Sequence, residues 1–277
     1  MTTHITAKRS WFHWDLKGLW KYRELVRLFA KKSLTVTYKQ TVLGPLWLIV
    51  NPLLSSFVYL VLFGRIAALG TEGIPQFLFY LSGTALWTFF AGCLNANSTL
   101  FLSNAHLFGK VYFPRLAVPL ANCITALVKL CVQLIPVAGM LVYYVVKGEV
   151  KPHPAWLLLL PFCLVQTGLL GMGCGLILSS ITARYRDLSS LVPIGTQLWM
   201  YATPVVYPLR RLPEGIIRRA VLINPVTMCM EVYRRALFGV GQIEWRYLFC
   251  SWGITALILL IGLLLFSHVE RTFLDTV

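Results

Sequence analysis

Long uncharged apolar blocks separated by short polar segments make up most of the chain after Leu43. About 20 apolar residues, rising roughly 1.5 Å each in a helix, cross a hydrocarbon core of roughly 30 Å. Six blocks are long enough, over about 46–64, 75–101, 116–146, 156–182, 188–207 and 247–268. The pattern predicts an all-α integral membrane protein whose six transmembrane helices occupy a domain at 46–277, with both termini on one side.

A shorter amphipathic segment lies in the leader, residues 1–45. Its apolar positions recur at three- and four-residue steps, and they are Leu19, Tyr22, Val26 and Phe29. Charged residues fall on the opposite face, which predicts a helix over about 15–32 lying flat on the membrane surface. The leader is rich in lysine and arginine, so the positive-inside rule places it and both termini in the cytosol.

The stretch 208–246, external in this topology, has apolar pieces at 220–230 and 236–240 that are too short to span a membrane. Asn224-Pro225 interrupts the first piece. Short apolar helices with a central breaker can dip into a membrane where protein shields their backbone groups. We expect a re-entrant hairpin over the outer mouth, and the alternative is a surface loop with an amphipathic helix.

Composition supports a membrane protein, because 57% of the residues are hydrophobic and 13% are charged, whereas soluble domains carry roughly 25% charged residues. The formal charge of +15 is explained by cytosolic segments that face anionic lipids, so we expect no nucleic-acid partner. The seven cysteines include no C-x-x-C pair, which favours small buried apolar side chains over a metal site.

Several kinds of chemistry are missing from the predicted spans. All ten carboxylates lie outside them and the five histidines are peripheral. Ion-coupled carriers usually need an intramembrane acid or histidine, and a membrane enzyme needs an acid–base pair, so both classes are disfavoured and we predict no catalytic residue. No G-x-x-x-x-G-K-[ST] phosphate cradle occurs either. Uphill transport would therefore draw its energy from another polypeptide.

Lys129 is the sole charged residue inside a predicted span, near the middle of the third. A buried ammonium needs a partner or water. Two interpretations remain open. The cation faces a hydrated path and contacts an anionic substrate, or the long side chain snorkels toward the membrane surface.

Aromatic and small residues mark two further features of the spans. Flat rings that line a pore can stack on sugar rings, although lipid-facing placement is an equal alternative. The candidates in the first and fifth spans are Trp47, Tyr59, Phe63, Trp199, Tyr201 and Tyr207. Gly171, Gly175 and Ser179 form a small-residue stripe that predicts close helix packing, within the chain or between chains.

Four local patterns recur together along the chain. They are YKQTVLGPLW at 38–47 with Asn51-Pro52-Leu53, KVYFPR at 110–115, ARYRD at 183–187, and TPVVYP at 203–208 followed by Asn224-Pro225. With the tail ERTFLD at 270–275, this set resembles the permease subunit of type-2 ABC exporters for lipid-linked surface polysaccharides of the O-antigen, capsule and teichoic-acid group. The resemblance covers nearly the whole chain.

This resemblance implies a homodimer of six-span subunits, each docked on a cytosolic ATPase that binds ATP and Mg, with a polysaccharide-sized channel at the dimer axis. It also implies external gate helices, with Asn224 and Pro225 as candidates, and a cytosolic coupling segment that corresponds to 104–115 here. The candidates for contact with the ATPase are Phe108, Lys110, Tyr112, Phe113 and Arg115. Alternatively, Tyr112 and Phe113 only anchor the third span. At Lys129 such permeases often carry an acidic residue, so no role is inherited there.

The leading hypothesis is that two copies form a channel that exports a lipid-linked polysaccharide across the plasma (bacterial inner) membrane, in contact with membrane lipids and with no cofactor or metal in this chain. Lys31, Lys32 and Lys39 would attract an anionic linker at the cytosolic entrance or simply hold the membrane surface. One alternative is a type-2 exporter of drugs or small lipids. Another is a membrane-embedded glycosyltransferase or lipid-modifying enzyme.

Overall fold

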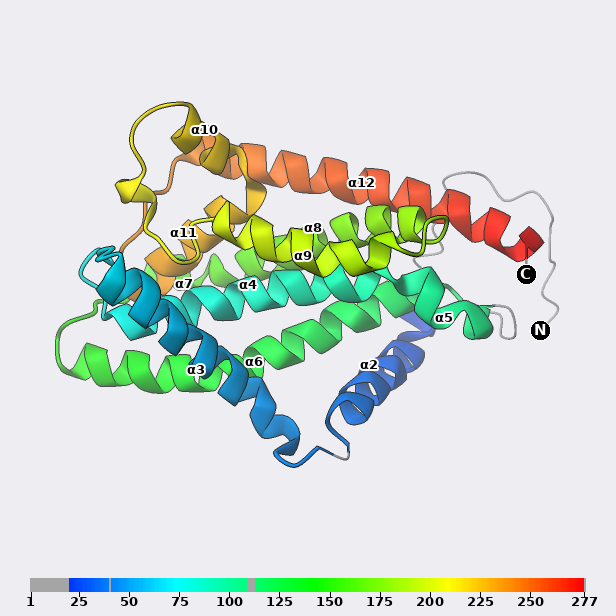
Figure 1. Cartoon of the computed structure of the whole chain (residues 1–277), viewed down its shortest axis with the longest axis horizontal. Coiled ribbons are helices and arrows are strands. Elements are labelled where there is room, and N and C mark those ends of the chain that lie inside the picture. Colours follow the sequence, from blue (N-terminus) through cyan, green and yellow to red (C-terminus); the bar gives the residue numbers. More distant parts are fainter. Residues whose placement is uncertain (1–19, 40, 109–112, 277) are drawn as a thin grey trace.

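A computed structural model describes residues 20–39, 41–108 and 113–276, and within these ranges every regular element is a helix (Figure 1). The helices are α2 Arg23–Tyr38, α3 Trp47–Tyr59, α4 Gln76–Ser98, α5 Leu100–Phe108, α6 Ala117–Val146, α7 Pro154–Leu157, α8 Leu160–Thr182, α9 Leu188–Tyr201, α10 Ile216–Ile223, α11 Pro225–Phe238 and α12 Trp245–Thr276. Tighter or wider helical turns occupy η1 Gly44–Leu46, η2 Leu60–Ile66 and η3 Leu209–Arg211. The prediction of an all-α protein is confirmed.

Five of these described segments are long and apolar enough to cross a membrane, and they are Gly44–Ile66, Gln76–Ser98, Ala117–Val146, Pro154–Thr182 and Trp245–Glu270. They correspond to five of the six predicted spans. The remaining one, predicted as a helix over 188–207, was too long, because α9 has 14 residues and measures about 21 Å. It ends at Tyr201 because Pro204 lacks a backbone N–H and disfavours helical backbone at Thr203.

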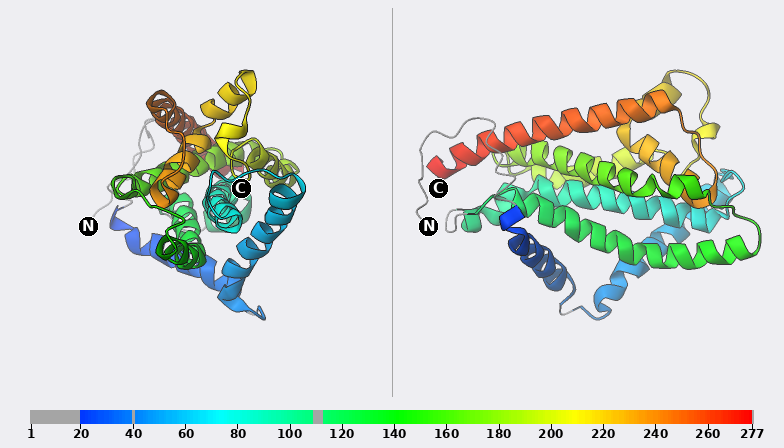
Figure 2. Two further views of the ribbon diagram at one scale, coloured as in Figure 1. Left: turned by 90° about the vertical axis from the view of Figure 1, so that its left-hand side faces the viewer. Right: turned by 180° about the vertical axis from the view of Figure 1, so that it is seen from behind.

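Helix α4 forms the centre of the bundle. Buried residues make up 78% of its most apolar stretch, against 11% for the segment containing α3 and 17% for α12. The view along the bundle shows α4 surrounded by the other long helices (Figure 2). Helices α3 and α12 therefore lie at the periphery, where each keeps a broad apolar surface outside the chain's own core.

The stripe of small residues on α8 packs against α4. A Cβ atom added to Gly175 would lie 2.6 Å from the Cβ of Asn97, and one added to Gly171 would lie 2.7 Å from the Cβ of Cys93. On another face of α8, a Cβ at Gly173 would lie 2.9 Å from the Cα of Leu259 in α12. The predicted close packing is confirmed, and it occurs within one chain.

The amphipathic helix of the leader is α2, and its predicted bounds of about 15–32 were wrong at the carboxyl end. Residues 1–19 are outside the described ranges, and α2 continues to Tyr38. The extra turns form because α2 packs along α6 and, beyond residue 32, still lines a cavity with it. Val26 and Ala30 are buried in this contact, and the ring of Phe29 lies 5.7 Å from that of Phe113.

The two ends of the bundle differ. At one end, on the left in Figure 1, α7, α10 and α11 gather; at the other, α5 and the carboxyl end of α12 emerge. The segment 208–246 contains α10 and α11, which are separated at Asn224 as the Asn224-Pro225 break predicted. Their bounds differ from the predicted apolar pieces at 220–230 and 236–240, and the re-entrant hairpin stays a prediction. At the opposite end the second span stops at Ser98, earlier than the predicted residue 101, because Thr99 leaves the helical conformation and α5 begins at Leu100.

Candidate functional site

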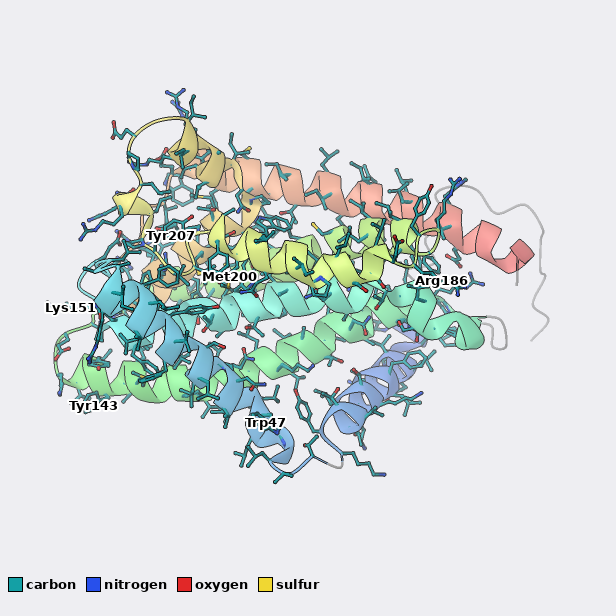
Figure 3. The ribbon with its side chains drawn as sticks, viewed as in Figure 1. Trp47, Tyr143, Lys151, Arg186, Met200 and Tyr207 are labelled. Carbon is teal, nitrogen blue, oxygen red and sulfur yellow. The ribbon has the colours of Figure 1, made fainter. Side chains whose placement is uncertain are left out.

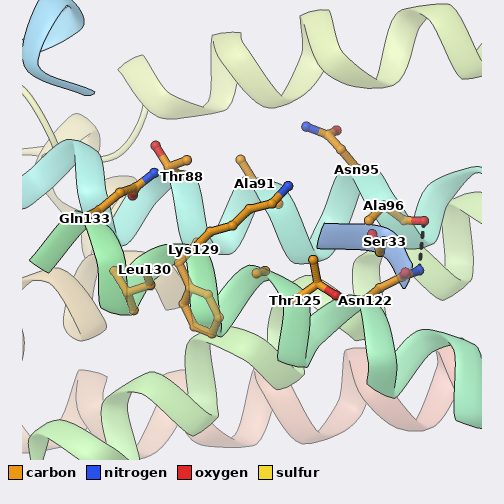
Figure 4. Close-up of a pocket in the computed structure, with 13 residues that line it drawn as sticks. Ser33, Thr88, Ala91, Asn95, Ala96, Asn122, Thr125, Lys129, Leu130 and Gln133 are labelled. Carbon is orange, nitrogen blue, oxygen red and sulfur yellow. Dashed lines mark hydrogen bonds between the residues drawn. The ribbon is translucent and has the colours of Figure 1, made fainter. Parts of the chain in front are cut away.

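Two adjoining cavities lie beside α4, with volumes of about 300 and about 400 Å³. Thr88, Lys129 and Gln133 line both of them, and we term the two adjoining cavities together the Lys129 groove. The smaller part lies between α2, α4 and α6, and the larger part extends between α3 and α9. Figure 4 shows the smaller part.

Helical periodicity brings the polar residues of the groove together. On α4 they are Thr84, Thr88 and Asn95, and on α6 they are Asn122, Thr125, Lys129 and Gln133. Steps of three, four and seven residues place side chains on one face of a helix. Each of these otherwise apolar helices therefore carries one polar stripe, and the two stripes border the same recess. Apart from Lys129, these groove residues were missed by the sequence analysis, although the stripes are visible there as hydroxyl and amide residues at helical spacing.

Lys129 projects into the groove. In Figure 4 its side chain extends from α6 across α4 toward Ala91, between Thr88 and Asn95. The position is 12 residues from the start of α6 and 17 from its end, about 18 and 26 Å along the axis, beyond the reach of a lysine side chain. Its ammonium nitrogen lies 5.9 Å from the centre of the Tyr38 ring. This placement favours the interpretation that the cation faces a hydrated path.

Some of the aromatic residues predicted to line the substrate path lie in the Lys129 groove, and others lie elsewhere. Trp47 and Tyr59 line the groove, and the Phe63 ring packs 6.0 Å from that of Tyr59. Trp199 instead packs edge-on against Phe90, with ring centres 5.1 Å apart, and borders a separate apolar cavity of about 480 Å³ between α8 and α9.

Two further aromatic candidates are not among the residues that line the groove. Tyr201 is exposed at the end of α9, beside Tyr59. Tyr207 is half-buried at the end of the bundle where α10 and α11 lie, as Figure 3 shows. The six rings therefore do not form one stacked path within this chain.

The three lysines predicted at the cytosolic entrance, Lys31, Lys32 and Lys39, are all exposed. Lys31 and Lys32 lie on α2, whose buried residues Val26 and Ala30 face the bundle. The exposed positions leave both of their predicted roles open.

The coupling candidates that the structure describes make contacts with other helices of the same chain. Phe113 is 7% exposed and contacts Phe29 of α2. Arg115 donates from Nη1 to the carbonyl oxygen of Glu270 at 2.8 Å, and its Nε lies 3.6 Å from Oε1 of Glu270 in α12. Arg115, the last residue of the KVYFPR pattern, thus contacts Glu270, the first residue of the ERTFLD pattern. Lys110 and Tyr112 lie outside the described residues, as does the side chain of Phe108, so contact with an ATPase stays a prediction.

Asn224 and Pro225 lie between α10 and α11, and Asn224 connects this junction to the segment after α9. The Asn224 side chain accepts a hydrogen bond from the Val226 N–H at 3.2 Å, which caps α11. Its amide donates to Oγ1 of Thr203 at 2.9 Å. Pro225 occupies the first turn of α11, where its missing N–H costs no helical hydrogen bond.

A fully buried ion pair lies beside this junction, and the sequence analysis did not identify it. Arg234 lies with Nη1 3.3 Å from Oε1 of Glu231, donates from Nη2 to the carbonyl oxygen of Val205 at 3.0 Å, and covers the Phe79 ring at 4.0 Å. Burial raises the pKa of Glu231, and the nearby Arg234 opposes that rise. The pair ties α11 to α4 and to the segment after α9.

Neither metal binding nor acid–base chemistry is indicated by the described residues. They contain no group of three or more His, Cys, Asp or Glu side chains that could hold a metal ion. The part of the chain that is described also places no carboxylate along the Lys129 groove.

Comparison with known proteins finds similarity over most of the chain. The sequence model of a family described as "ABC-2 type transporter" matches residues 24–238. Two proteins of Klebsiella pneumoniae named O-antigen export system permease protein RfbA are each 28% identical over 254 residues, which is 91% of this chain and 94% of theirs. A Myxococcus xanthus protein of the same name is 28% identical over 225 residues, 80% of this chain and 84% of its own.

Proposed function

Because the chain belongs to the ABC-2 type transporter family, we propose that it is the channel-forming subunit of an ATP-driven exporter for a lipid-linked surface polysaccharide. The relatives are named as permeases of O-antigen export systems. The chain is a transport subunit and not an enzyme. Its cargo would be a glycan of the O-antigen, capsule or teichoic-acid type.

The observation that carries the proposal is the character of the Lys129 groove. Hydroxyl and amide side chains alternate there with the rings of Trp47, Tyr59 and Trp87. Sugars offer hydroxyl groups to the former and apolar ring faces to the latter. A drug exporter would be expected to use a predominantly apolar recess, and the apolar cavity between α8 and α9 is the feature that keeps this alternative open.

A second copy of the chain would complete the channel. The groove opens between α3 and α9, and the segment containing α3 has only 11% of its most apolar stretch buried. An apolar helix with so little cover packs against lipid or another subunit. In a homodimer with α3 and α9 near the axis, two grooves would face each other across a common path, and α9 with residues 202–208 would provide the sixth crossing.

The orientation follows from charge. The lysine- and arginine-rich leader, α5 and the end of α12 would face the cytosol, and α10 and α11 would form the external gate of a plasma-membrane protein (the inner membrane in bacteria). A cytosolic ATPase, which binds ATP and Mg, would dock near 104–115. Phe113 and Arg115 would pass its movement to α2 and α12, because these are the helices that the two side chains contact.

The proposal is tested by reconstituting the chain with its ATPase partner in lipid vesicles and measuring ATP hydrolysis and cargo transport. Lipid-linked glycan should stimulate hydrolysis, and hydrophobic drugs should not. Stimulation by drugs alone would reject the glycan cargo. Product formation by this chain without an ATPase would support a membrane-embedded glycosyltransferase or lipid-modifying enzyme instead.

Coupling is tested in the same vesicles with Arg115→Met. Losing both contacts to Glu270 should abolish most glycan-dependent stimulation while basal hydrolysis and membrane insertion remain. Arg65→Met is the matched control, since Arg65 is exposed beside the end of η2. Equal stimulation in both variants would remove Arg115 from the proposed role.

A further inference from the structure

The cation of the Lys129 groove has no counter-charge within the described chain. Lys129 is half-buried near the middle of α6, and the described residues that line both parts of the groove include no aspartate or glutamate. The centre of the Tyr38 ring lies 5.9 Å from the ammonium nitrogen. An ammonium group at this depth is costly unless water or an anion accompanies it.

Unused hydrogen-bonding groups surround this cation. Asn95 accepts a hydrogen bond from Thr196 at 3.1 Å through Oδ1, while its amide nitrogen has no partner in the described part of the chain. Gln133 is 4% exposed, and its side-chain oxygen is buried without a partner among the described residues. The two ends of a glutamine amide exchange by a half-turn, so Gln133 can also present its N–H₂ group.

The groove is reached from the helix that lies at the membrane surface. Ser33 of α2 lines the smaller cavity and Tyr38 lines the larger one. The same helix exposes Lys31 and Lys32 on its outer side. A lipid whose charged group enters from the headgroup region therefore meets the exposed lysines of α2 first and would reach Lys129 by moving deeper along the groove, with its tail in lipid.

We propose that Lys129, Asn95 and Gln133 form a binding site for the phosphate group of a lipid. A phosphoryl group supplies the missing negative charge and accepts hydrogen bonds from the ammonium and from both amides. Neutral donors and one cation, with no carboxylate to repel an anion, match this chemistry and not that of a metal ion. The inference rests on the proposed function for one point: the lipid is the phosphate-linked anchor of the exported glycan.

Binding is measured on the purified full-length chain in detergent, without ATPase or glycan. Farnesyl phosphate is the probe and farnesol is its uncharged counterpart, and tryptophan fluorescence reports occupancy because Trp47 and Trp87 line the groove. The wild-type chain should bind farnesyl phosphate at least about tenfold more tightly than farnesol, as expected for charge-assisted hydrogen bonds. Lys129→Gln should lose this preference, and Lys129→Arg should retain it.

Lys147→Gln is the matched control, because it removes the same charge at an exposed position beyond the far end of α6. It should bind both probes as the wild-type chain does. If Lys129→Gln also keeps the wild-type preference for farnesyl phosphate, the site assignment is overturned. The double variant Asn95→Leu/Gln133→Leu gives an independent test: it should weaken phosphate binding several-fold, and unchanged binding overturns the assignment.

The source of the phosphate is separated by a second pair of probes, phosphatidic acid and diacylglycerol. Suppose that the chain prefers farnesyl phosphate to farnesol through Lys129, but shows little preference for phosphatidic acid over diacylglycerol. This result supports the glycan anchor as the source of the phosphate. The reverse result overturns that source and identifies bilayer lipid. Because this assay contains no ATPase, its failure leaves glycan-stimulated hydrolysis unaffected, and failure of that stimulation leaves the phosphate site standing.

Ligand-free stability distinguishes a binding residue from one that supports the fold. Removing an unpaired, half-buried charge relieves its desolvation, so Lys129→Gln should melt at or above the wild-type temperature while losing phosphate preference. Melting well below the wild-type chain would show that Lys129 supports the fold and would overturn the assignment.

Discussion

Replacing Gly175 with alanine tests how closely α8 must approach α4. The new Cβ would lie 2.6 Å from the Cβ of Asn97 and 2.8 Å from the carbonyl oxygen of Leu94. Ordinary contacts of a Cβ atom begin near 3.4 Å, so the helices must separate by several tenths of an ångström. The carbonyl belongs to the backbone of α4, which cannot yield by changing a rotamer.

The expected loss combines two opposing effects. Overpacking a close helix contact costs roughly 1–3 kcal/mol, while alanine is more favourable than glycine inside a helix by roughly 0.5–1 kcal/mol. The net destabilisation is about 0–2.5 kcal/mol, and each kcal/mol lowers the melting temperature by roughly 2–4 °C in a chain of this size class. A larger residue such as leucine should prevent normal packing.

The measurement is thermal melting of purified protein in detergent, followed by size-exclusion chromatography of the remaining folded fraction. Gly253→Ala on α12 is the matched control, because a Cβ there meets no atom within 4 Å. It should keep or raise the melting temperature. If Gly175→Ala melts at or above the wild type, the contact of α8 with α4 is looser than described and the packing argument fails.

Three further predictions concern the end of the bundle that contains α10 and α11. Arg234→Met alone should destabilise by roughly 3–5 kcal/mol because it leaves Glu231 buried without its cation, whereas Glu231→Gln/Arg234→Met should recover part of the loss in the same melting assay; equal melting of the two variants contradicts a buried pair. Because burial raises the pKa of Glu231, its contribution to stability is largest below the ordinary value of about 4.3 and is lost as pH rises through the raised value. Wild-type melting should therefore fall over that window relative to Glu231→Gln, and parallel pH profiles would contradict the shift. Asn224→Ala should cost about 0.5–2 kcal/mol through loss of the cap, and melting like the wild type would show that the cap and the bond to Thr203 contribute nothing.

The apolar spans could be located from the sequence because their cause is local. A helix in lipid must satisfy every backbone hydrogen bond within itself, so uncharged length alone identifies it. The predicted break at Asn224-Pro225 also has a local cause, and it appears in the structure between α10 and α11. The span predicted over 188–207 was too long because Pro204 ends α9, a local signal that the apolar run concealed.

The site was predictable only in part. Lys129 stood out as a lone charge, and the Trp47 and Tyr59 rings were candidates that the structure brings to the same groove. Trp199 was a candidate of the same kind and packs against Phe90 instead. Periodicity shows which residues share a helix face, but it does not show which helix that face meets.

By itself, the sequence determined that this chain is a helical membrane protein, where its long apolar helices run, and that one cation lies among them, because these properties depend on hydrophobic length and neighbouring residues. Only the tertiary structure decided that the stripe at Gly175 contacts α4 within the same chain, that Arg234 is buried with Glu231, and that Arg115 reaches Glu270. These contacts join residues from different helices or depend on which helices cover them. Their energies depend on how helices pack, and that information is absent from any single apolar block.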